Sequence, residues 1–417
     1  MYETGHADTQ EKIMAKSGNT TLRALPEQSA EELSELKQKI RIHRMKILIL
    51  IFILTGVAIG LLFAAFLYFE NKVYTEYEVM EQVERRETEA AEYKEFQGNV
   101  LQYTQDGAVY SSITGEVFWN QTYEMESPRI TTCEDYLAIY EQGGNRIYIM
   151  NTDGQQGTIQ TTMPLQRVSI ARQGTVAVLM EDSQTSYIHM YDKDGKQLAG
   201  GGLHIENSGY PLDLALSMDA QKLAVSMLDI TDASVKSTVV FYNYGKVGKN
   251  EIDNIVGSYT YDDMMIPSIH FVTNDKLLAF GDTKILIYEG TQKPVVMKEI
   301  KNRNQIRSLY YNENYFGLVY DNPDSAKGYL TSIYNMKGRL VLEQKFDLDY
   351  TDIGFLQNGL LCIRNEKSVQ IYTMRGSKRF EHTFDRSIYD VISGSGQLDY
   401  WFIMSGETNR IKLKDDF

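Results

Sequence analysis

The pattern of apolar and polar residues changes several times along this chain. It begins with a polar stretch, continues with apolar residues at helical spacing, and then becomes a long run without any ionisable side chain. A Glu-rich stretch without glycine or proline follows, and after it short apolar runs alternate with glycine-containing turns. We therefore expect a disordered tail (1–28), an amphipathic helix (29–46), an apolar helix (47–69), a helical acidic stalk (70–97) and a β-rich region (98–417).

The β-rich region repeats one phrase seven times: an apolar run, usually ending in tyrosine, followed within a few residues by glycine, as in 285–288 before Gly290. A second apolar run lies between most copies, and the repeat of about 43 residues is typical of a four-stranded propeller blade. We therefore expect an all-β β-propeller with seven blades, or eight if the runs at 100–104 and 411–413 form another. Strands at 109–112 and 117–123 are expected to close the ring in one sheet with strands at 388–392 and 400–404. The innermost strands are expected near Arg129, Arg167, Leu212, Ser268, Ile306, Asp352 and Ile388.

The uncharged run at 47–69 is long enough to cross a membrane. At ~1.5 Å per residue it reaches about 34 Å, compared with a hydrocarbon core of ~30 Å. A cleaved signal peptide is the alternative, although its apolar part is usually shorter. Basic residues precede the run and glutamates follow it, and basic flanks stay on the cytoplasmic side. We therefore expect a single-pass protein with its tail and amphipathic helix in the cytoplasm and its propeller outside.

Small residues recur within the apolar helix at Gly56, Gly60 and Ala64. A face without bulky side chains lets two membrane helices approach closely, so a homodimer through this helix is one interpretation. The other is that glycine and alanine are simply common in membrane helices.

The helical stalk is predicted from the segment that follows the apolar helix. Val73, Tyr77 and Met80 lie at i, i+4 and i+7, and nothing breaks a helix before Gly98. Such a helix would lift the propeller off the membrane.

Charge and cysteine content narrow the class of protein. The net charge is −14, and acidic residues outnumber basic ones in the outer region, which argues against nucleic acid as a partner. The two cysteines, Cys133 and Cys362, lie in distant repeats, so we expect two free thiols rather than a disulfide. Few cysteines in an outer domain fit the plasma membrane of a Gram-positive bacterium better than a secreted eukaryotic domain.

Motifs for catalysis or metal binding are missing from the sequence pattern. Turns such as 192–195 contain Asp and Gly but lack the spaced ligands and final glutamate of a calcium loop, so we interpret them as hairpin turns. The six histidines show no ligand spacing, and the Gly-Ser-Gly at 394–396 is not a serine nucleophile elbow. We therefore assign no catalytic residue, no metal and no cofactor.

Long connections, such as 229–237, 252–267 and 321–328, are predicted after the second and fourth strands of several blades, which places them on one face of the propeller. Binding residues usually lie on long loops of a rigid scaffold, so this face is the candidate partner-binding surface. Insertion drift on a tolerant surface is the alternative. The candidate residues are Asp229, Asp232, Tyr259, Tyr261, Asp262, Asp263, Asp321 and Asp324.

A resemblance supports this layout. The run at 100–119, with its Thr114-Gly115 turn and Trp119, resembles a blade of quinoprotein-like propellers. The whole arrangement looks like an uncharacterised clostridial and Gram-positive family of membrane-anchored propellers of the quinoprotein-like or WD40-like type. The tryptophan is not repeated in each blade, which argues against a quinone cofactor, and the resemblance implies no activity.

These observations favour an extracytoplasmic scaffold or sensor that binds a protein or cell-envelope partner on the long-loop face. An enzyme acting on a cell-wall or extracellular polymer, with a site assembled in the propeller channel, is the alternative. A purely structural envelope protein is a third option.

Overall fold

The computed structural model describes residues 30–86, 88, 90–182, 185–204, 209–230 and 234–414. Within them lie one long α-helix, two short 3-10 helices and 32 β-strands. The chain divides into two compact units between Tyr68 and Phe69, and each unit is described by itself. The predicted tail at 1–28 falls outside the described residues.

The first unit contains α1 (Ala30–Glu70), an uninterrupted helix. The helices predicted at 29–46 and 47–69 are therefore parts of one element. Its segment Leu33–Phe69 is long and apolar enough to cross a membrane, a property that signal sequences share. Its large apolar side chains from Leu33 to Phe69 are exposed.

The small residues of α1 lie four positions apart and so share one helix face. At Gly56 and Gly60 an added Cβ would meet no atom within 4 Å. The helix thus has an open strip on that face, and pairing of two helices along it stays a prediction.

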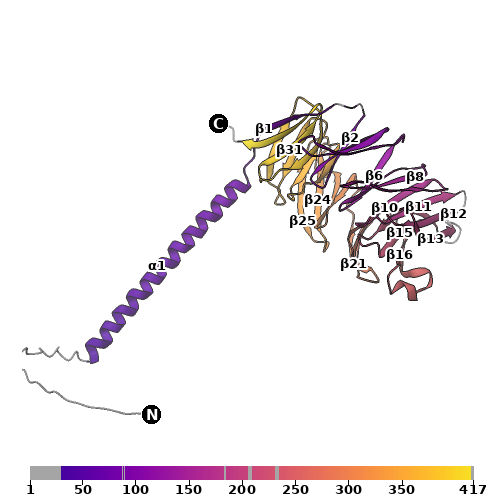
Figure 1. The fold of residues 1–417 in the computed structure, drawn as a ribbon. Helices are drawn as coiled ribbons and strands as arrows, with labels where there is room; N and C mark the ends of the chain where they lie inside the picture. The colour runs from indigo at the N-terminus through magenta and orange to yellow at the C-terminus, as the bar shows by residue number, and fades with distance from the viewer. Residues whose placement is uncertain are drawn as a thin grey trace, which may run out of the picture. The chain divides into compact units, whose positions relative to one another are not determined.

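The second unit consists of eight four-stranded antiparallel sheets, the blades of a β-propeller (Figure 1). Blades 1 to 4 are formed by β2 (Glu92–Phe96), β3 (Asn99–Thr104), β4 (Gly107–Ser111), β5 (Val117–Thr122); β6 (Pro128–Cys133), β7 (Tyr136–Glu141), β8 (Arg146–Asn151), β9 (Gly154–Gln160); β10 (Leu165–Ile170), β11 (Val176–Asp182), β12 (Thr185–Tyr191), β13 (Gln197–His204); and β14 (Tyr210–Leu216), β15 (Lys222–Asp229), β16 (Lys236–Asn243), β17 (Ile255–Asp262). Between β16 and β17 lie η1 (Gly248–Asn250) and η2 (Ile252–Asn254).

Blades 5 to 8 follow the same order of strands, except that the last blade takes its outermost strand from the start of the unit. They are formed by β18 (Ser268–Thr273), β19 (Lys276–Phe280), β20 (Lys284–Glu289), β21 (Val295–Lys301); β22 (Ser308–Tyr311), β23 (Tyr315–Asp321), β24 (Tyr329–Asn335), β25 (Leu340–Phe346); β26 (Asp352–Phe355), β27 (Leu361–Arg364), β28 (Ser368–Tyr372), β29 (Lys378–Thr383); and β30 (Ile388–Ser393), β31 (Asp399–Met404), β32 (Glu407–Lys414), β1 (Glu76–Glu84).

The blade count is eight, so the expectation of seven is wrong and the alternative of eight is confirmed. All seven predicted innermost strands are present, as β6, β10, β14, β18, β22, β26 and β30. The eighth is β2, which lies within the predicted stalk and contacts β30 to close the ring. Strands near residues 100–123 and 388–404, predicted to share one sheet, form separate blades.

The helical stalk predicted at 70–97 is wrong, because β1 and β2 occupy most of that segment. β1 runs antiparallel to β32, beginning with the pair Glu76 and Lys414, and Figure 1 shows it beside the yellow C-terminal strands. Its Tyr77 packs against the rings of His382 and Phe384 at 4.9 and 5.3 Å. The ring is closed by strands from both ends of the propeller unit, but the N-terminal one is β1, which lies outside the predicted β-rich region.

The apolar core lies between neighbouring blades rather than in one central mass. At the seam between blades 7 and 8, Phe380 and Phe384 pack with Phe402 and Ile411, all of them buried. Tyr74, in the segment that leads into β1, belongs to the same cluster. The segment after α1 is therefore part of the propeller core.

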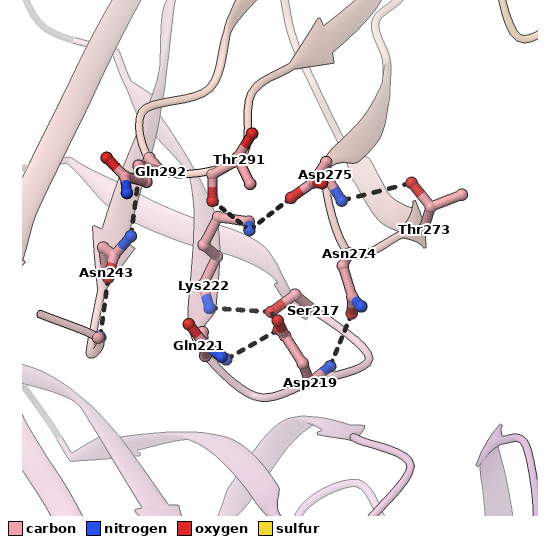
Figure 2. Close-up of polar contacts among 11 residues, drawn as sticks. Ser217, Asp219, Gln221, Lys222, Asn243, Thr273, Asn274, Asp275, Thr291 and Gln292 are labelled. Carbon is pink, nitrogen blue, oxygen red and sulfur yellow. Dashed lines mark hydrogen bonds and ion pairs between the residues drawn. The ribbon is translucent and has the colours of Figure 1, made fainter. Parts of the chain in front are cut away.

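A polar network joins blades 4 and 5 (Figure 2). The ammonium of Lys222, a residue that is only 2% exposed, donates to Asp275 Oδ1 at 2.9 Å and to the Thr291 carbonyl at 2.8 Å. The backbone N–H of Asp219 donates to Asn274 Oδ1 at 2.8 Å. A buried charge must be paired and hydrogen-bonded, so this network fixes how the two blades meet.

Candidate functional site

The two faces of the propeller are defined by its connections. Connections after second and fourth strands form the long-loop face, and those after first and third strands form the turn face. In blade 4 the connection between β16 and β17 carries η1 and η2, so a long connection also lies on the turn face. Residues near 252 were predicted on the long-loop face, and that prediction is wrong because β17 begins only at Ile255.

The tyrosines predicted as loop residues lie in strand β17. The Tyr259 hydroxyl donates to the Pro294 carbonyl at 2.8 Å, and the hydroxyls of Tyr261 and Tyr288 are 2.8 Å apart. Both rings lie against the apolar core between blades 4 and 5. Tyr259 and Tyr261 therefore pack the blade seam, and a loop position for them is wrong.

The described acidic residues lie at or just after strand ends on the long-loop face, but in two separate blades, 4 and 6, and three of them form ion pairs. Arg307 holds the pKa of Asp321 below its ordinary value through a hydrogen bond, with a smaller opposing effect of desolvation. Asp229 ends β15, and Asp232 lies outside the described residues. The ion pairs are Asp262 with Lys236 at 3.9 Å, Asp321 with Arg307 at 2.8 Å and Asp324 with Lys345 at 2.5 Å.

Exposed apolar residues accompany these carboxylates at one end of blade 4. The backbone N–H of Asp263 donates to the Val235 carbonyl at 2.8 Å, which ties the connection after β15 to the one after β17. Ile230 is the most exposed residue of the group. We call the group the blade-4 patch: Tyr210 (44% exposed), Ile230 (67%), Val235 (37%) and Met265 (39%).

A second candidate site is a cavity of about 360 Å³ lined by the innermost strands of blades 2 to 6. Its charged residues are Arg167 on β10 and Asp213 on β14, with Arg167 Nε 3.7 Å from Asp213 Oδ1. Asp213 also accepts a hydrogen bond from the Ile269 N–H of the next blade at 2.9 Å. Burial raises its pKa to about 6 in spite of these contacts.

The carboxylate of Asp390 repeats this arrangement on the opposite part of the ring. It lies on β30 and accepts a hydrogen bond from the Glu95 N–H of the next blade at 2.9 Å. Arg364 of the preceding blade is 3.8 Å away. Burial raises the pKa of Asp390 to about 6 as well. Asp213 and Asp390 therefore act as equivalent clasps between neighbouring blades.

Ser268 and His270 lie beside Asp213 in the cavity and suggest a catalytic triad at first sight. Ser268 Oγ and His270 Nε2 are 2.9 Å apart, and Ser268 also hydrogen-bonds Asp213. An ionised carboxylate only accepts, so the serine hydroxyl donates its one hydrogen to Asp213 and accepts from the imidazole N–H. A general base needs the opposite polarity, because it must take the serine proton.

The imidazole of His270 is a poor proton acceptor for a further reason. Burial lowers its pKa to about 4. Its ring stacks on Tyr311 with centroids 4.6 Å apart. The group thus serves packing and hydrogen bonding in the cavity wall.

Protonation of the two clasps is expected to give a measurable pH dependence of stability. Their pKa is about 6 when folded and near the ordinary 3.8 when unfolded, so the folded state holds more protons between pH 4 and 6. Their contribution is fully present below pH 4 and is lost as pH rises through 6, on the order of 3 kcal/mol per carboxyl. The measurement is urea unfolding of Asp213→Asn and of the parent chain between pH 4 and 7.5. The parent's advantage in free energy of unfolding over the variant should shrink as pH rises.

Asp321→Asn is the matched control for this measurement. Its carboxyl is exposed and its pKa is lowered, so its contribution is present above pH 4 and is lost only below that value. The difference in free energy of unfolding between this variant and the parent chain should stay constant between pH 4 and 7.5. If the difference between Asp213→Asn and the parent chain also stays constant with pH, Asp213 does not stabilise the fold through its raised pKa.

The clasps share a short sequence feature. An aspartate followed by an apolar residue recurs in innermost strands, at Asp213, Asp352 and Asp390.

The two thiols are free, as predicted, with Cys362 buried and Cys133 half-buried beside the cavity. Burial raises the pKa of Cys133 to about 11 and that of Cys362 to about 12, so both are unreactive at neutral pH.

Comparisons with known proteins place the fold. The chain is similar to the C-terminal WD40 domain of Sif2, with a TM-score of 0.53 and 10% identity over 82% of this chain and 99% of that chain. It is also similar to the Neurospora crassa Pan2 WD40 domain, with a TM-score of 0.43 and 8% identity over 82% and 96% of the two chains. At these identities the likeness to Sif2 shows a WD40-like propeller fold alone.

No curated protein matches the chain. A family described as "Family of unknown function (DUF5711)" matches residues 70–413, which is the propeller without α1. The narrower resemblance to membrane-anchored clostridial propellers therefore stays a prediction. The match spans most of the sequence, and the chain belongs to the DUF5711 family.

Proposed function

We propose that the protein is a membrane-anchored extracytoplasmic scaffold or sensor whose propeller binds a protein or cell-envelope partner. α1 is the anchor, with the N-terminus in the cytoplasm and the propeller outside the plasma membrane of a Gram-positive bacterium. The basic residues before the apolar run and the glutamates after it support this orientation. No nucleic acid, metal or cofactor is part of the proposal.

The blade-4 patch is the observation that carries the binding role. Isolated exposed apolar residues are common on proteins, but here four lie at one end of one blade beside Asp229, Asp262 and Asp263. WD40-like propellers offer a rigid support for such surfaces. We expect the partner to present apolar side chains together with lysine or arginine.

The enzyme alternative finds less support in the cavity. The Ser268 hydroxyl donates its hydrogen to Asp213 and only accepts from His270, so His270 cannot take the serine proton. In the described part of the chain, no group of three His, Cys, Asp or Glu residues is placed to hold a metal ion. We therefore do not assign a reaction to this cavity.

Replacement of Ile230 by serine is expected to reduce partner capture at least tenfold while leaving the fold intact. An exposed substitution usually changes stability by less than ~0.5 kcal/mol, whereas an interface anchor can contribute ~2 kcal/mol or more. The measurement is cross-linking of intact cells followed by affinity purification, quantified against the parent protein. Circular dichroism melting checks the fold.

Ile252→Ser is the matched control, because Ile252 is 86% exposed and lies in the same blade on the turn face. It should leave capture unchanged. Loss of capture in Ile252→Ser but not in Ile230→Ser would assign binding to the turn face and contradict the proposal.

A further inference from the structure

A cavity of about 660 Å³ lies between the outer parts of blades 3 and 4. Residues of β12 and β13 in blade 3 line one side of it, and residues of β15, β16 and β17 in blade 4 line the other. Much of the lining is apolar, because Ile188 of blade 3 packs with Leu223 and Met227 of blade 4, all of them buried. Pockets for small organic ligands usually have volumes of about 300–1,000 Å³, so a ligand of that kind fits here.

Gly201 on β13 leaves much of this space open. It pairs with Ile188 on β12, and an added Cβ at Gly201 would meet no atom within 4 Å. Blades 2, 4, 5 and 7 carry a larger side chain at the equivalent position, counted from the β-bulge of the same strand pair. These side chains pack in the seam with the next blade, and they are Ile159, Tyr259, Ile300 and His382. The seam between blades 3 and 4 therefore lacks the side chain that fills these four seams.

Polar groups gather at the end of the cavity near the connection between β16 and β17. Desolvation raises the pKa of Tyr242, with a smaller contribution from the Asp253 carboxylate. Desolvation also raises the pKa of Tyr244 to about 12, with a smaller contribution from Tyr242. Asp253 is the one charged side chain among the described residues that line the cavity. This end is therefore negative and carries two aromatic rings.

We infer that this cavity is a binding site for a small amphiphilic amine, a molecule with an apolar body and an ammonium head. The body lies beside Gly201 and against Ile188 and Leu223, where burial of apolar surface favours binding. The ammonium lies at the Asp253 end, because a carboxylate and the faces of tyrosine rings both attract a cation. The site shares no residue with the blade-4 patch and does not depend on the proposed membrane anchor.

The probe for this site is phenylbutylamine, and phenylbutyrate serves as an anion of similar size. The full-length chain in phosphatidylcholine nanodiscs is titrated by ligand-detected NMR, with empty nanodiscs as the blank. The amine should bind saturably with a dissociation constant of about 1 mM or tighter, as expected for a ligand of this size. Phenylbutyrate should bind at least tenfold more weakly, because the Asp253 carboxylate repels it.

Gly201→Leu should weaken binding of the amine at least tenfold and keep the fold, because the new side chain enters open space. Gly202→Leu is the matched control, since a side chain at this exposed position points to the opposite face of β13 and should leave binding unchanged.

Asp253→Asn tests the charged end of the cavity. It should weaken binding of the amine about tenfold and leave binding of the neutral phenylbutanol unchanged. Asparagine tolerates the left-handed backbone of Asp253, whose φ is 53°, so the variant should keep the fold. Circular dichroism melting checks the fold of all three variants.

Three results would overturn the inference. The first is equal affinity for phenylbutylamine and phenylbutyrate, and the second is no saturable binding of the amine to the parent chain. The third is parent-like binding by Gly201→Leu in a variant that melts like the parent, since the amine would then lie elsewhere. If Gly201→Leu does not fold, equal loss of phenylbutylamine and phenylbutanol binding in Asp253→Asn overturns the ammonium site instead. None of these results bears on the proposed function, because Ile230→Ser tests that surface separately.

Discussion

A propeller chain that starts at residue 91 is expected to unfold at a much lower urea concentration than one that starts at Phe69. Only the first lacks β1, which forms eight register pairs with β32 and closes blade 8. Each hydrogen bond contributes a net ~1 kcal/mol, so the free energy of unfolding should fall by several kcal/mol. A typical folded protein has a free energy of unfolding of about 5–15 kcal/mol. It also exposes Tyr400 and Ile411, which are fully buried when the seam is closed. Tryptophan fluorescence and circular dichroism in urea measure the effect.

The chain from Phe69 is the matched control, since it lacks α1 but keeps the closing strand. A synthetic peptide of residues 69–86, added in trans, should restore part of the lost stability by strand addition. Equal unfolding midpoints for the two chains would show that the ring holds without β1. That result would contradict its role as the closing strand.

Asp275→Ala is expected to lower the free energy of unfolding by about 3 kcal/mol, because it leaves the buried ammonium of Lys222 without its counter-ion. Lys222→Met should cost less, since methionine fills the same apolar path and Asp275, 45% exposed, stays hydrated. The double variant Lys222→Met, Asp275→Ala should therefore be more stable than Asp275→Ala alone. Urea unfolding at neutral pH measures all three.

The exposed pair of Lys345 and Asp324 offers the comparison. Its side chains are 55% and 68% exposed, so Asp324→Ala should change stability by less than about 1 kcal/mol. If Asp275→Ala and Asp324→Ala cost the same, burial does not control the strength of the blade 4 and 5 network.

Most of the propeller could be predicted from the sequence because inner and middle strands carry continuous apolar runs bounded by glycine turns. The outer edge could not. In β1 only one side of the strand is covered, so Glu78, Glu81 and Gln82 make the segment look like a solvated helix. Tyr77 contributes a helical spacing by coincidence, whereas its real neighbours, His382 and Phe384, come from the far end of the sequence. The eighth blade was missed because its innermost strand, β2, also lies in the segment predicted as a helical stalk.

The candidate sites were harder to predict because their chemistry depends on contacts between blades. Asp213 is identified as a clasp only by the Ile269 N–H, 56 positions along the chain. Tyr259 was predicted to be a binding residue, but its hydroxyl donates to the Pro294 carbonyl of the next blade. The connection between β16 and β17 was misplaced for a local reason, since two 3-10 turns delay the start of the strand.

The direct link between α1 and the closing strand has a mechanical consequence. In the proposed anchored state, a pull on α1 reaches the propeller through Asn71 and Tyr74, whose contacts with blade 7 bear the load first. Beyond them the load falls on the ladder that begins at Glu76 and Lys414. A pull along β1 shears all its hydrogen bonds together, whereas a sideways pull peels them one at a time. Under the proposed function, tension between the membrane anchor and a bound partner is thus carried by the β1–β32 ladder of blade 8.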